Sequence, residues 1–259
     1  MNKKKALVTG ASDGIGKVFM LRLAEQGYVV TGVARSYDKL RALVQSLPGV
    51  GHRFIMADLT NEEQLNHVVL DLQKEGYNLL INNAGYGMYN RFHEMSLSGQ
   101  LNMIDLNVGA LVVLSHHFLN KAQADDALIN ISSGLSLVTY PGGAVYVATK
   151  AFVTNFTESL WYENKRRDIY VAAILPGATK TNFHNVAFDD PNKRPPESRY
   201  QNAEDVVEEA LTVIAKRKRP SFITGAKNRF LINLASRFMS RSSMIKTMAG
   251  NNPALKNNH

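Results

Sequence analysis

The chain has 259 residues, of which 45% are hydrophobic and 20% are charged. A chain of this length can bury a full core in one large domain, and this composition excludes an intrinsically disordered protein. The sequence contains no cysteine and has a formal net charge of +8, so disulfides and thiolate chemistry are excluded and a basic, solvated surface is expected.

Short runs of aliphatic residues alternate with longer segments of helical periodicity along the chain. The predicted strands cover residues 6–8, 28–33, 52–57, 79–81, 127–131, 170–175 and 221–224. The predicted helices cover residues 17–26, 37–47, 60–74, 101–120, 146–166 and 203–216. Thr60 is the expected N-cap of the third helix, with Glu63 as its capping-box partner. This alternation predicts an α/β fold: a Rossmann-like, doubly wound, seven-stranded parallel sheet with helices on both faces.

No repeat, linker or change of composition divides the chain, so we expect a single domain over residues 1–225. Residues 180–200 are too long for an ordinary connection, and their prolines, Pro191, Pro195 and Pro196, predict a lid or substrate loop. Residues 226–259 are basic and amphipathic, and they predict a helical C-terminal extension.

A glycine-rich turn connects the first predicted strand to the first predicted helix. Residues without a Cβ allow the backbone to approach a ligand there, and the helix N-terminus presents free N–H groups to a pyrophosphate. We therefore predict that this turn binds a dinucleotide. The expected contacts are Gly10, Ser12, Gly14, Ile15 and Gly16.

The end of the second predicted strand indicates which dinucleotide is bound. A carboxylate there would accept hydrogen bonds from the adenosine ribose of NAD, but the strand runs into Arg35 and Ser36 instead. Arg35 can pair with a 2′-phosphate, a charge-assisted contact worth about 1.5–3 kcal/mol. We therefore expect NADP (NADPH) rather than NAD, although Asp13 beside the glycines does not reinforce the preference for a phosphate.

Polar and small residues also follow the third, fourth and sixth predicted strands. The carboxylate after the third strand can accept a hydrogen bond from the adenine amino group, and the small residues after the fourth predict a wall of the cofactor pocket. Hydroxyls and backbone after the sixth strand can hold the nicotinamide carboxamide. The predicted cofactor contacts at these places are Asp58, Leu59, Asn83, Ala84, Gly85, Pro176, Gly177, Thr179 and Thr181.

Tyr146 and Lys150 are four residues apart in a predicted helix, so they share one of its faces. A nearby ammonium favours the phenolate, which predicts a lowered Tyr146 pKa and suits this phenol for proton transfer to a carbonyl oxygen. Ser133 follows the fifth strand and can hydrogen-bond the developing oxyanion. Asn107, on the long apolar helix, is either part of this site or a core amide bonded to backbone.

In their order and spacing, these motifs together resemble the short-chain dehydrogenase/reductase family over about residues 5–225. The resemblance implies that Tyr146 is the general acid/base and that Lys150 lowers its pKa and binds the nicotinamide ribose. It implies that Ser133 orients the carbonyl and that Asn107 holds a water in a proton relay. It further implies hydride transfer between nicotinamide and the carbonyl carbon, and a homodimer or homotetramer.

Two other functions compete with an enzyme. A regulatory protein that binds the cofactor without catalysis could have the same fold, but the intact set of Asn107, Ser133, Tyr146 and Lys150 argues against it. The basic tail could dock on a membrane or a partner, although such helices more often pack on their own fold or on a sister subunit.

The substrate is expected to be a small-molecule carbonyl or alcohol with lipophilic character. Apolar residues in the predicted lid and nearby loops indicate an apolar pocket. They are Met88, Tyr89, Leu135, Phe183, Phe188 and Tyr200.

The remaining expectations are negative. Residues 6–9 are too few for the apolar region of a secretory signal, and no run of about eighteen uncharged apolar residues predicts a membrane span, so we expect a cytoplasmic protein. The basic residues are densest at 216–246, without interleaved aromatic residues on one early segment, so we expect no nucleic-acid partner. No histidine lies at ligand spacing from acidic residues, so no metal site is predicted.

Overall fold

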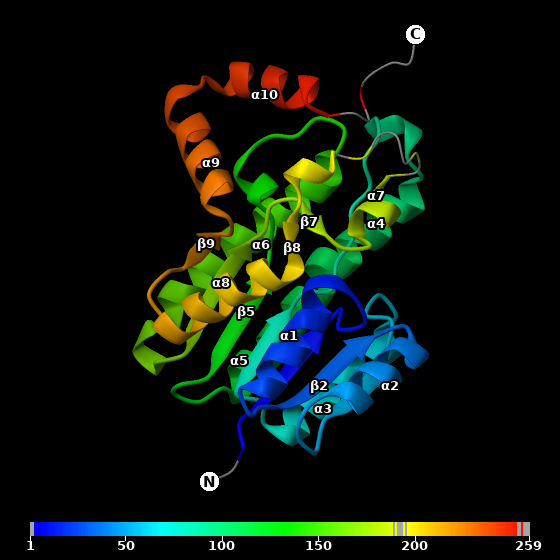
Figure 1. Ribbon diagram of the computed structural model, residues 1–259, viewed down its shortest axis with the longest axis vertical. Coiled ribbons are helices and arrows are strands. Elements are labelled where there is room, and N and C mark those ends of the chain that lie inside the picture. The colour runs from blue at the N-terminus through cyan, green and yellow to red at the C-terminus, as the bar shows by residue number, and fades with distance from the viewer. Residues whose placement is uncertain (1–2, 189, 191–193, 195, 253–254, 256–259) are drawn as a thin grey trace.

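The computed structural model describes residues 3–188, 190, 194, 196–252 and 255. Its main sheet has seven parallel strands in the order β3-β2-β1-β4-β5-β6-β9 (Figure 1). This confirms the predicted doubly wound sheet, whose strand order reverses between β1 and β4. The strands are β1 (Lys5–Thr9), β2 (Val29–Ala34), β3 (Arg53–Met56), β4 (Leu79–Asn82), β5 (Ala127–Ile131), β6 (Tyr170–Leu175) and β9 (Ser221–Ile223).

Helices cover both faces of the sheet, because successive side chains of each buried strand point to opposite faces. Ala6 and Val8 of β1 join a core cluster with α1, α2 and α8, whereas Leu7 joins a second cluster with α3, α5 and α6. The long helices of the sheet layers are α1 (Gly14–Glu25), α2 (Tyr37–Ser46), α3 (Glu62–Glu75), α5 (Leu111–Lys121), α6 (Ala144–Glu163) and α8 (Ala203–Lys216).

The cap of α3 differs from the prediction. Asn61, and not Thr60, is the N-cap, and its side-chain oxygen accepts a hydrogen bond from the backbone N–H of Gln64 at 3.0 Å. The Thr60 hydroxyl donates instead to the carboxylate of Asp58 at 2.8 Å. Thr60 and Asn61 are both residue types that favour the N-cap position. The Thr60 side chain is bonded to Asp58, so Asn61 caps the helix.

The predicted helix over 101–120 is divided into three parts: α4 (Leu97–Ile104), a π-helical segment (Asp105–Ala110) and α5. Over Leu97–Lys121 it is long and apolar enough to cross a membrane, with a mean hydropathy of 1.3 in its most apolar window. In the structure Leu114 and Phe118 of α5 are buried in the core cluster beneath the sheet. The α5 part therefore packs on the core, although only 33% of the apolar window is buried in the structure.

The segment after β6 contains short elements that the sequence did not predict. A two-stranded sheet pairs β7 (Thr179–Lys180) with β8 (Gln201–Asn202), and α7 (Phe183–Ala187) lies between them in sequence. Of the prolines in the predicted lid, Pro196 is described, whereas Pro191 and Pro195 lie outside the described residues.

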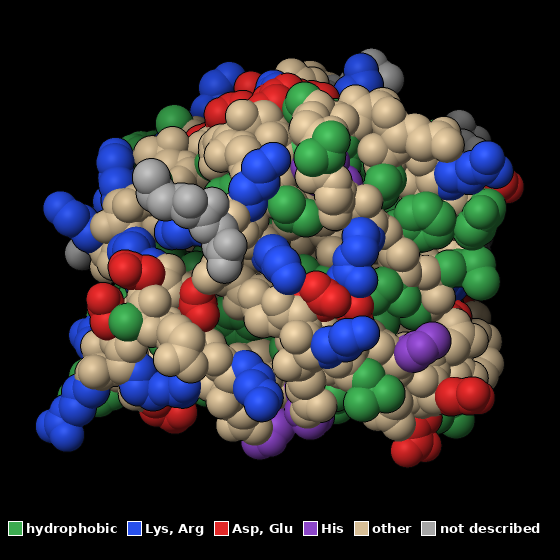
Figure 2. Space-filling view, turned by 90° about the horizontal axis from the view of Figure 1, so that it is seen from below, with side chains coloured by type: hydrophobic (Ala, Val, Ile, Leu, Met, Phe, Trp, Pro, Cys, Tyr) green, Lys and Arg blue, Asp and Glu red, His purple; other side chains and the backbone are tan. Residues whose placement is uncertain are grey.

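The C-terminal extension is helical, as predicted, and consists of α9 (Ala226–Phe238) and α10 (Arg241–Gly250). Figure 1 shows both helices at the end of the molecule opposite the N-terminus. The face seen in Figure 2 carries basic side chains spread among acidic and uncharged ones, as a solvated basic surface would. The domain boundary at residue 225 and the absence of a nucleic-acid partner stay predictions.

Candidate active site

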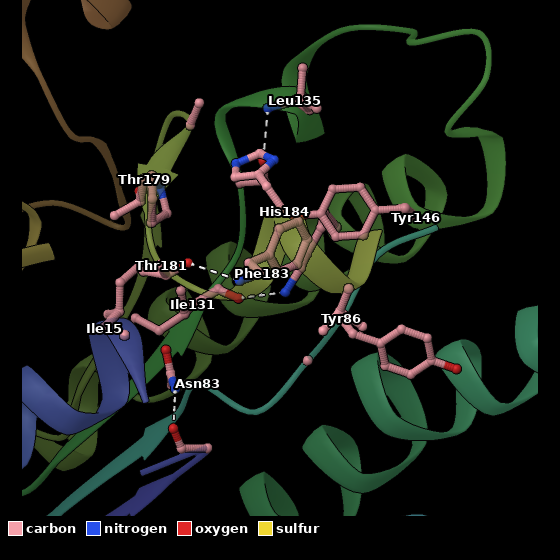
Figure 3. A pocket seen from close by; sticks show the side chains of 18 of the residues that line it. Ile15, Asn83, Tyr86, Ile131, Leu135, Tyr146, Thr179, Thr181, Phe183 and His184 are labelled. Carbon is pink, nitrogen blue, oxygen red and sulfur yellow. Dashed lines mark hydrogen bonds between the residues drawn. The ribbon is translucent and has the colours of Figure 1, made fainter. Parts of the chain in front are cut away.

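A cavity of about 1210 Å³ lies at the carboxyl ends of the strands and brings most of the predicted site residues together (Figure 3). Gly16 and Asn107 are the predicted site residues that do not line it. Those that do are Gly10, Ser12, Gly14, Ile15, Arg35, Ser36, Asp58, Leu59, Asn83, Ala84, Gly85, Ser133, Tyr146, Lys150, Pro176, Gly177, Thr179 and Thr181.

The glycine turn has the backbone geometry that the sequence predicts. Gly10 and Gly14 have φ angles of +66° and +50°, in the region where a side chain causes strain. A Cβ on Gly16 would overlap the carbonyl oxygen of Gly10, so Gly16 allows α1 to pack closely on the turn, and it does not line the cavity. Asp13 caps α1 and accepts a hydrogen bond from the Gly14 N–H at 2.6 Å. The helix N-terminus otherwise faces the cavity.

Two cations line the cavity after β2. Arg35 is mostly exposed, and its guanidinium is 3.9 Å from the Asp58 carboxylate. Lys39, which the sequence reasoning missed, is 4.0 Å from Asp13. Lys39 is four residues after Arg35, about one helical turn, and this spacing could have identified Lys39 as a second phosphate contact from the sequence. Burial acts to raise the pKa of Asp58, but hydrogen bonds from Thr60 and the charge of Arg35 together lower it, so the carboxylate stays ionised.

Asn83 joins the turn after β4 to the glycine turn. Its side-chain NH₂ donates to the backbone oxygen of Thr9 at 2.9 Å and to that of Gly10 at 3.3 Å. The Thr9 hydroxyl accepts from the backbone N–H groups of Asn83 and Ala84, both at 2.9 Å. The two turns that form the floor of the cavity are thus fixed to each other.

Tyr146 is buried on the cavity wall at the start of α6, and the nearby hydroxyls of Ser133 and Tyr89 act to lower its pKa. The structure therefore places the predicted pair Ser133 and Tyr146 together on the wall of one cavity. Tyr89 is an additional partner, which the sequence reasoning treated only as pocket lining. Its ring lies edge-on to Tyr146 with a centroid distance of 5.5 Å.

The predicted lowering of the Tyr146 pKa is wrong. Burial raises the pKa of Tyr146 to about 12, although the nearby hydroxyls of Ser133 and Tyr89 oppose the rise. Burial also lowers the pKa of Lys150 to about 8. Dehydration is therefore the main cause of both shifts, although the Lys150 ammonium donates to the backbone oxygen of Ile131 at 3.0 Å.

Asn107 lies behind the cavity wall, in the π-helical segment, and is buried. Its NH₂ group donates to the backbone oxygen of Tyr86 at 2.9 Å and to the Thr149 hydroxyl at 3.1 Å, and its oxygen accepts from the Tyr86 N–H at 3.1 Å. The side-chain amide therefore bonds backbone, the second of the two interpretations left open by the sequence. It supports the turn that carries Gly85.

The other end of the cavity is aromatic and apolar. Of the residues predicted to form an apolar pocket, Tyr89, Leu135, Phe183 and Phe188 line it, whereas Met88 and Tyr200 do not. Tyr200 packs behind the wall, edge-on to the ring of His184 at 4.8 Å.

Two lining features at this end were missed. His184, whose pKa is lowered to about 4 by burial and by the charge of Arg194, is a neutral lining residue. Residues of α9 and α10, among them Leu231 and Met248, also line the cavity, although the sequence reasoning placed no site residue in the tail.

The lining residues fit a phosphorylated dinucleotide. The glycine turn and the N-terminus of α1 can accommodate a pyrophosphate, and the exposed cations Arg35 and Lys39 lie where a 2′-phosphate can pair with them. The same cavity is lined by the hydroxyls of Ser133 and Tyr146, which can bind one carbonyl oxygen. The arrangement can therefore hold a redox cofactor beside a carbonyl compound.

Comparison with known proteins agrees with this geometry. Residues 4–192 match the family model for short chain dehydrogenase. The chain is 33% identical over 222 residues to a Haemophilus influenzae protein named "Probable NADP-dependent dehydrogenase", covering 83% of this chain and 86% of that protein. It is 31% identical over 185 residues to Mus musculus 17-beta-hydroxysteroid dehydrogenase type 3, covering 68% of this chain but only 60% of the mouse protein.

A solved structure shows the same fold over nearly the whole chain. The short-chain dehydrogenase from Sphingobium yanoikuyae in complex with NADPH superposes with a TM-score of 0.78 at 30% identity. The superposition covers 90% of this chain and 93% of that one.

Proposed function

We propose that this chain, which belongs to the short-chain dehydrogenase family, is an NADP-dependent oxidoreductase that interconverts a ketone or aldehyde and the corresponding alcohol. The observation that carries the proposal is that Ser133, Tyr146 and Lys150 line the same cavity as the glycine turn. A proton donor and a dinucleotide-type turn in one cavity are the two requirements of this reaction.

Tyr146 is the proposed proton donor in the direction of reduction. Its pKa of about 12 keeps the phenol protonated at neutral pH. Because the hydroxyls of Ser133 and Tyr146 both line this part of the cavity, one carbonyl oxygen can accept hydrogen bonds from both. The Ser133 contact orients the carbonyl, and the phenol of Tyr146 delivers its proton to the oxygen as negative charge develops there.

Lys150 is the proposed electrostatic partner of Tyr146. Its ammonium is 6.0 Å from the centroid of the Tyr146 ring and is charged at neutral pH, since its pKa is about 8. A cation at this place attracts the phenolate that remains after proton transfer. The family resemblance adds a second role, a hydrogen bond to the nicotinamide ribose.

Residues at the end of the cavity that contains the glycine turn would hold the cofactor, which supplies the hydride when bound. The glycine turn takes the pyrophosphate, while Arg35, Lys39 and Ser36 take the 2′-phosphate. Asp58 would bind the adenine amino group, and Thr181 the nicotinamide carboxamide. The preference for NADP over NAD is supported by the absence of a carboxylate directly after β2 and by the NADPH bound to the Sphingobium yanoikuyae relative.

The proposal includes a homodimer or homotetramer. Leu101 and Ile104 of α4 and Phe152 of α6 are exposed large apolar side chains. The elements α4 and α6 pack on each other, so these side chains belong to neighbouring surfaces. Exposed apolar surface of this kind is typical of a subunit interface.

A panel of ketones and aldehydes, assayed with NADPH and with NADH by nicotinamide absorbance, tests the proposed function. We expect reduction of at least one lipophilic carbonyl, with NADPH preferred. NADPH binding without turnover across the whole panel would favour the regulatory alternative. A preference for NADH would contradict the role of Arg35.

A further inference from the structure

We propose that Arg199 and His184 form an anion-binding subsite at the aromatic end of the cavity, and that the substrate is an oxo acid whose carboxylate binds there. This inference rests on the proposed function and names its substrate class. Three observations carry it: the charges on the cavity wall, an imidazole without a hydrogen-bond partner, and an aromatic path from this subsite to Tyr146.

The two ends of the cavity differ in charge. At the end that contains the glycine turn, each of the two lining cations lies next to a carboxylate, Asp13 or Asp58. These two are the carboxylates among the described lining residues. Arg199 lines the aromatic end, where the described wall contributes no acidic side chain. An anionic group of a ligand would therefore meet a cation there without a competing carboxylate on the wall.

Arg199 is placed so that its guanidinium can reach a ligand. It ends a short 3₁₀ helix (Glu197–Arg199) directly before β8, and its side chain is exposed where it lines the cavity. Burial raises the pKa of Tyr140 to about 12, and the charge of Arg199 opposes that rise. Since Tyr140 also lines the cavity, the guanidinium lies close to the aromatic wall.

His184 of α7 supplies the second observation. It is only 9% exposed, yet it lines the cavity, and Figure 3 shows its ring beside those of Phe183 and Tyr146. Its Nδ1 atom is buried and has no hydrogen-bond partner among the described residues. A buried polar atom without a partner is costly unless a bound group satisfies it. The imidazole can donate one N–H to a carboxylate oxygen.

Arg199 and His184 belong to one part of the wall, and a further cation lies near them. Tyr200, the residue after Arg199, packs its ring edge-on against His184 at a centroid distance of 4.8 Å. Burial and the charge of Arg194 lower the pKa of His184 to about 4. The ring is therefore uncharged at neutral pH. The positive potential that opposes its protonation favours an anion bound beside it.

An aromatic path joins Tyr146 to this subsite. The ring centroid of Tyr89 lies 5.5 Å from that of Tyr146 and 5.9 Å from that of Tyr140, and all three residues line the cavity. Apolar atoms that pack on these rings are removed from water, which stabilises the complex. A substrate with its carbonyl oxygen at Tyr146 and its carboxylate at Arg199 therefore has an apolar body between the two groups.

Three oxo acids with apolar bodies of different length test the inference, each compared with its neutral methyl ester. They are levulinate, para-acetylbenzoate and acetylbiphenylcarboxylate. The experiment measures kcat/KM with NADPH for all six compounds, together with calorimetric binding of each acid and of NADPH. We expect the biphenyl acid to exceed its ester in kcat/KM by about tenfold, because a charge-assisted hydrogen bond at an exposed arginine has about this strength.

Two variants remove the proposed contacts, and a third is their control. Arg199→Met and His184→Phe are each expected to lower kcat/KM for the biphenyl acid by about tenfold and to leave that for its ester unchanged. Lys180→Met removes an exposed cation from β7, the strand that pairs with β8, and Lys180 does not line the cavity. This control is expected to change neither value. Because Arg199 is exposed, its variant keeps the test decisive even if His184→Phe does not fold.

The other outcomes separate the subsite from the reaction. Equal kcat/KM for acid and ester in every pair, or equal effects of Arg199→Met and Lys180→Met, would overturn the inference while turnover upholds the proposed function. Binding of the biphenyl acid that depends on Arg199, without turnover of any of the six compounds, would uphold the subsite and contradict the proposed function.

Discussion

The Lys150 ammonium lies 6.0 Å from the centroid of the Tyr146 ring, and both side chains are buried on one face of α6. Burial shifts the two pKa values in opposite directions, to about 12 for Tyr146 and to about 8 for Lys150. Both shifts favour the uncharged form. The phenol of Tyr146 therefore holds its proton firmly, and the ammonium of Lys150 holds its proton weakly.

This relationship predicts the pH dependence of reduction. Lys150 is charged below its pKa of about 8 and loses its charge as the pH rises through that value, whereas Tyr146 stays protonated until about 12. We expect kcat/KM for reduction to be constant at lower pH and to fall above about 8. A profile measured from pH 6 to 10, for the unmodified protein and for Lys150→Met, checks the assignment. The substitution should leave low activity without the step near 8, and an unchanged step would assign the titration to another group.

Arg35 is expected to determine the cofactor preference. Arg35→Ala removes a charge-assisted contact of about 1.5–3 kcal/mol, so the Kd for NADPH should rise by about ten- to over a hundredfold while that for NADH stays the same. Arg41→Ala is a suitable control, because Arg41 is exposed on α2, the helix that follows Arg35, and does not line the cavity. Fluorescence titration of each variant with NADPH and with NADH measures the two Kd values. Equal losses for NADPH and NADH would exclude a 2′-phosphate contact.

Gly16 is expected to be intolerant of any side chain. A Cβ there would overlap the Gly10 carbonyl oxygen, and backbone of the turn cannot move aside without losing its geometry. We expect Gly16→Ala to destabilise the protein by about 1–3 kcal/mol, the usual range for overpacking, and to weaken cofactor binding. Gly109→Ala is the control, since a Cβ at Gly109 would meet no atom within 4 Å. Urea unfolding compares the two, and equal stabilities would show that the turn adapts.

Subunit association is expected to depend on the apolar surface of α4 and α6. Phe152, 41% exposed, stacks on Phe156 with a centroid distance of 5.5 Å. Phe152→Glu would bury a charge in the proposed interface, so light scattering should show a smaller particle. Leu70→Glu on α3, where Leu70 is 61% exposed, should leave the mass unchanged. A monomer in the unmodified protein would contradict the proposed assembly.

Much of the fold could be predicted because most strands of the sheet are short, largely buried runs. All residues of β5 and β6 are buried, which gives continuous apolar segments bounded by polar loops. The site motifs follow these strands directly, so the sheet topology alone brings Asn83, Ser133 and Pro176 to one edge. Most of the predicted cofactor contacts therefore line one cavity, and their contacts with a cofactor stay predictions.

What the sequence could not provide depends on contacts between distant residues. The π-helical segment around Asn107 lies within an apolar run that reads as one continuous helix, and its amide bonds to Tyr86, 21 residues away. The pKa of Tyr146 depends on burial, which its spacing from Lys150 does not reveal. The position of Ile232 beside Gly134 follows from how the tail folds back, which no local pattern indicates.

The most direct test of the proposed chemistry is Tyr146→Phe, assayed for carbonyl reduction and for NADPH binding in the same preparation. Loss of the phenolic hydroxyl should lower kcat by about 10²–10⁴-fold, the usual contribution of a positioned proton donor, while the Kd for NADPH stays within error of the unmodified protein. Reduction at an undiminished rate by the phenylalanine variant would contradict the assignment of Tyr146 as the group that protonates the carbonyl oxygen.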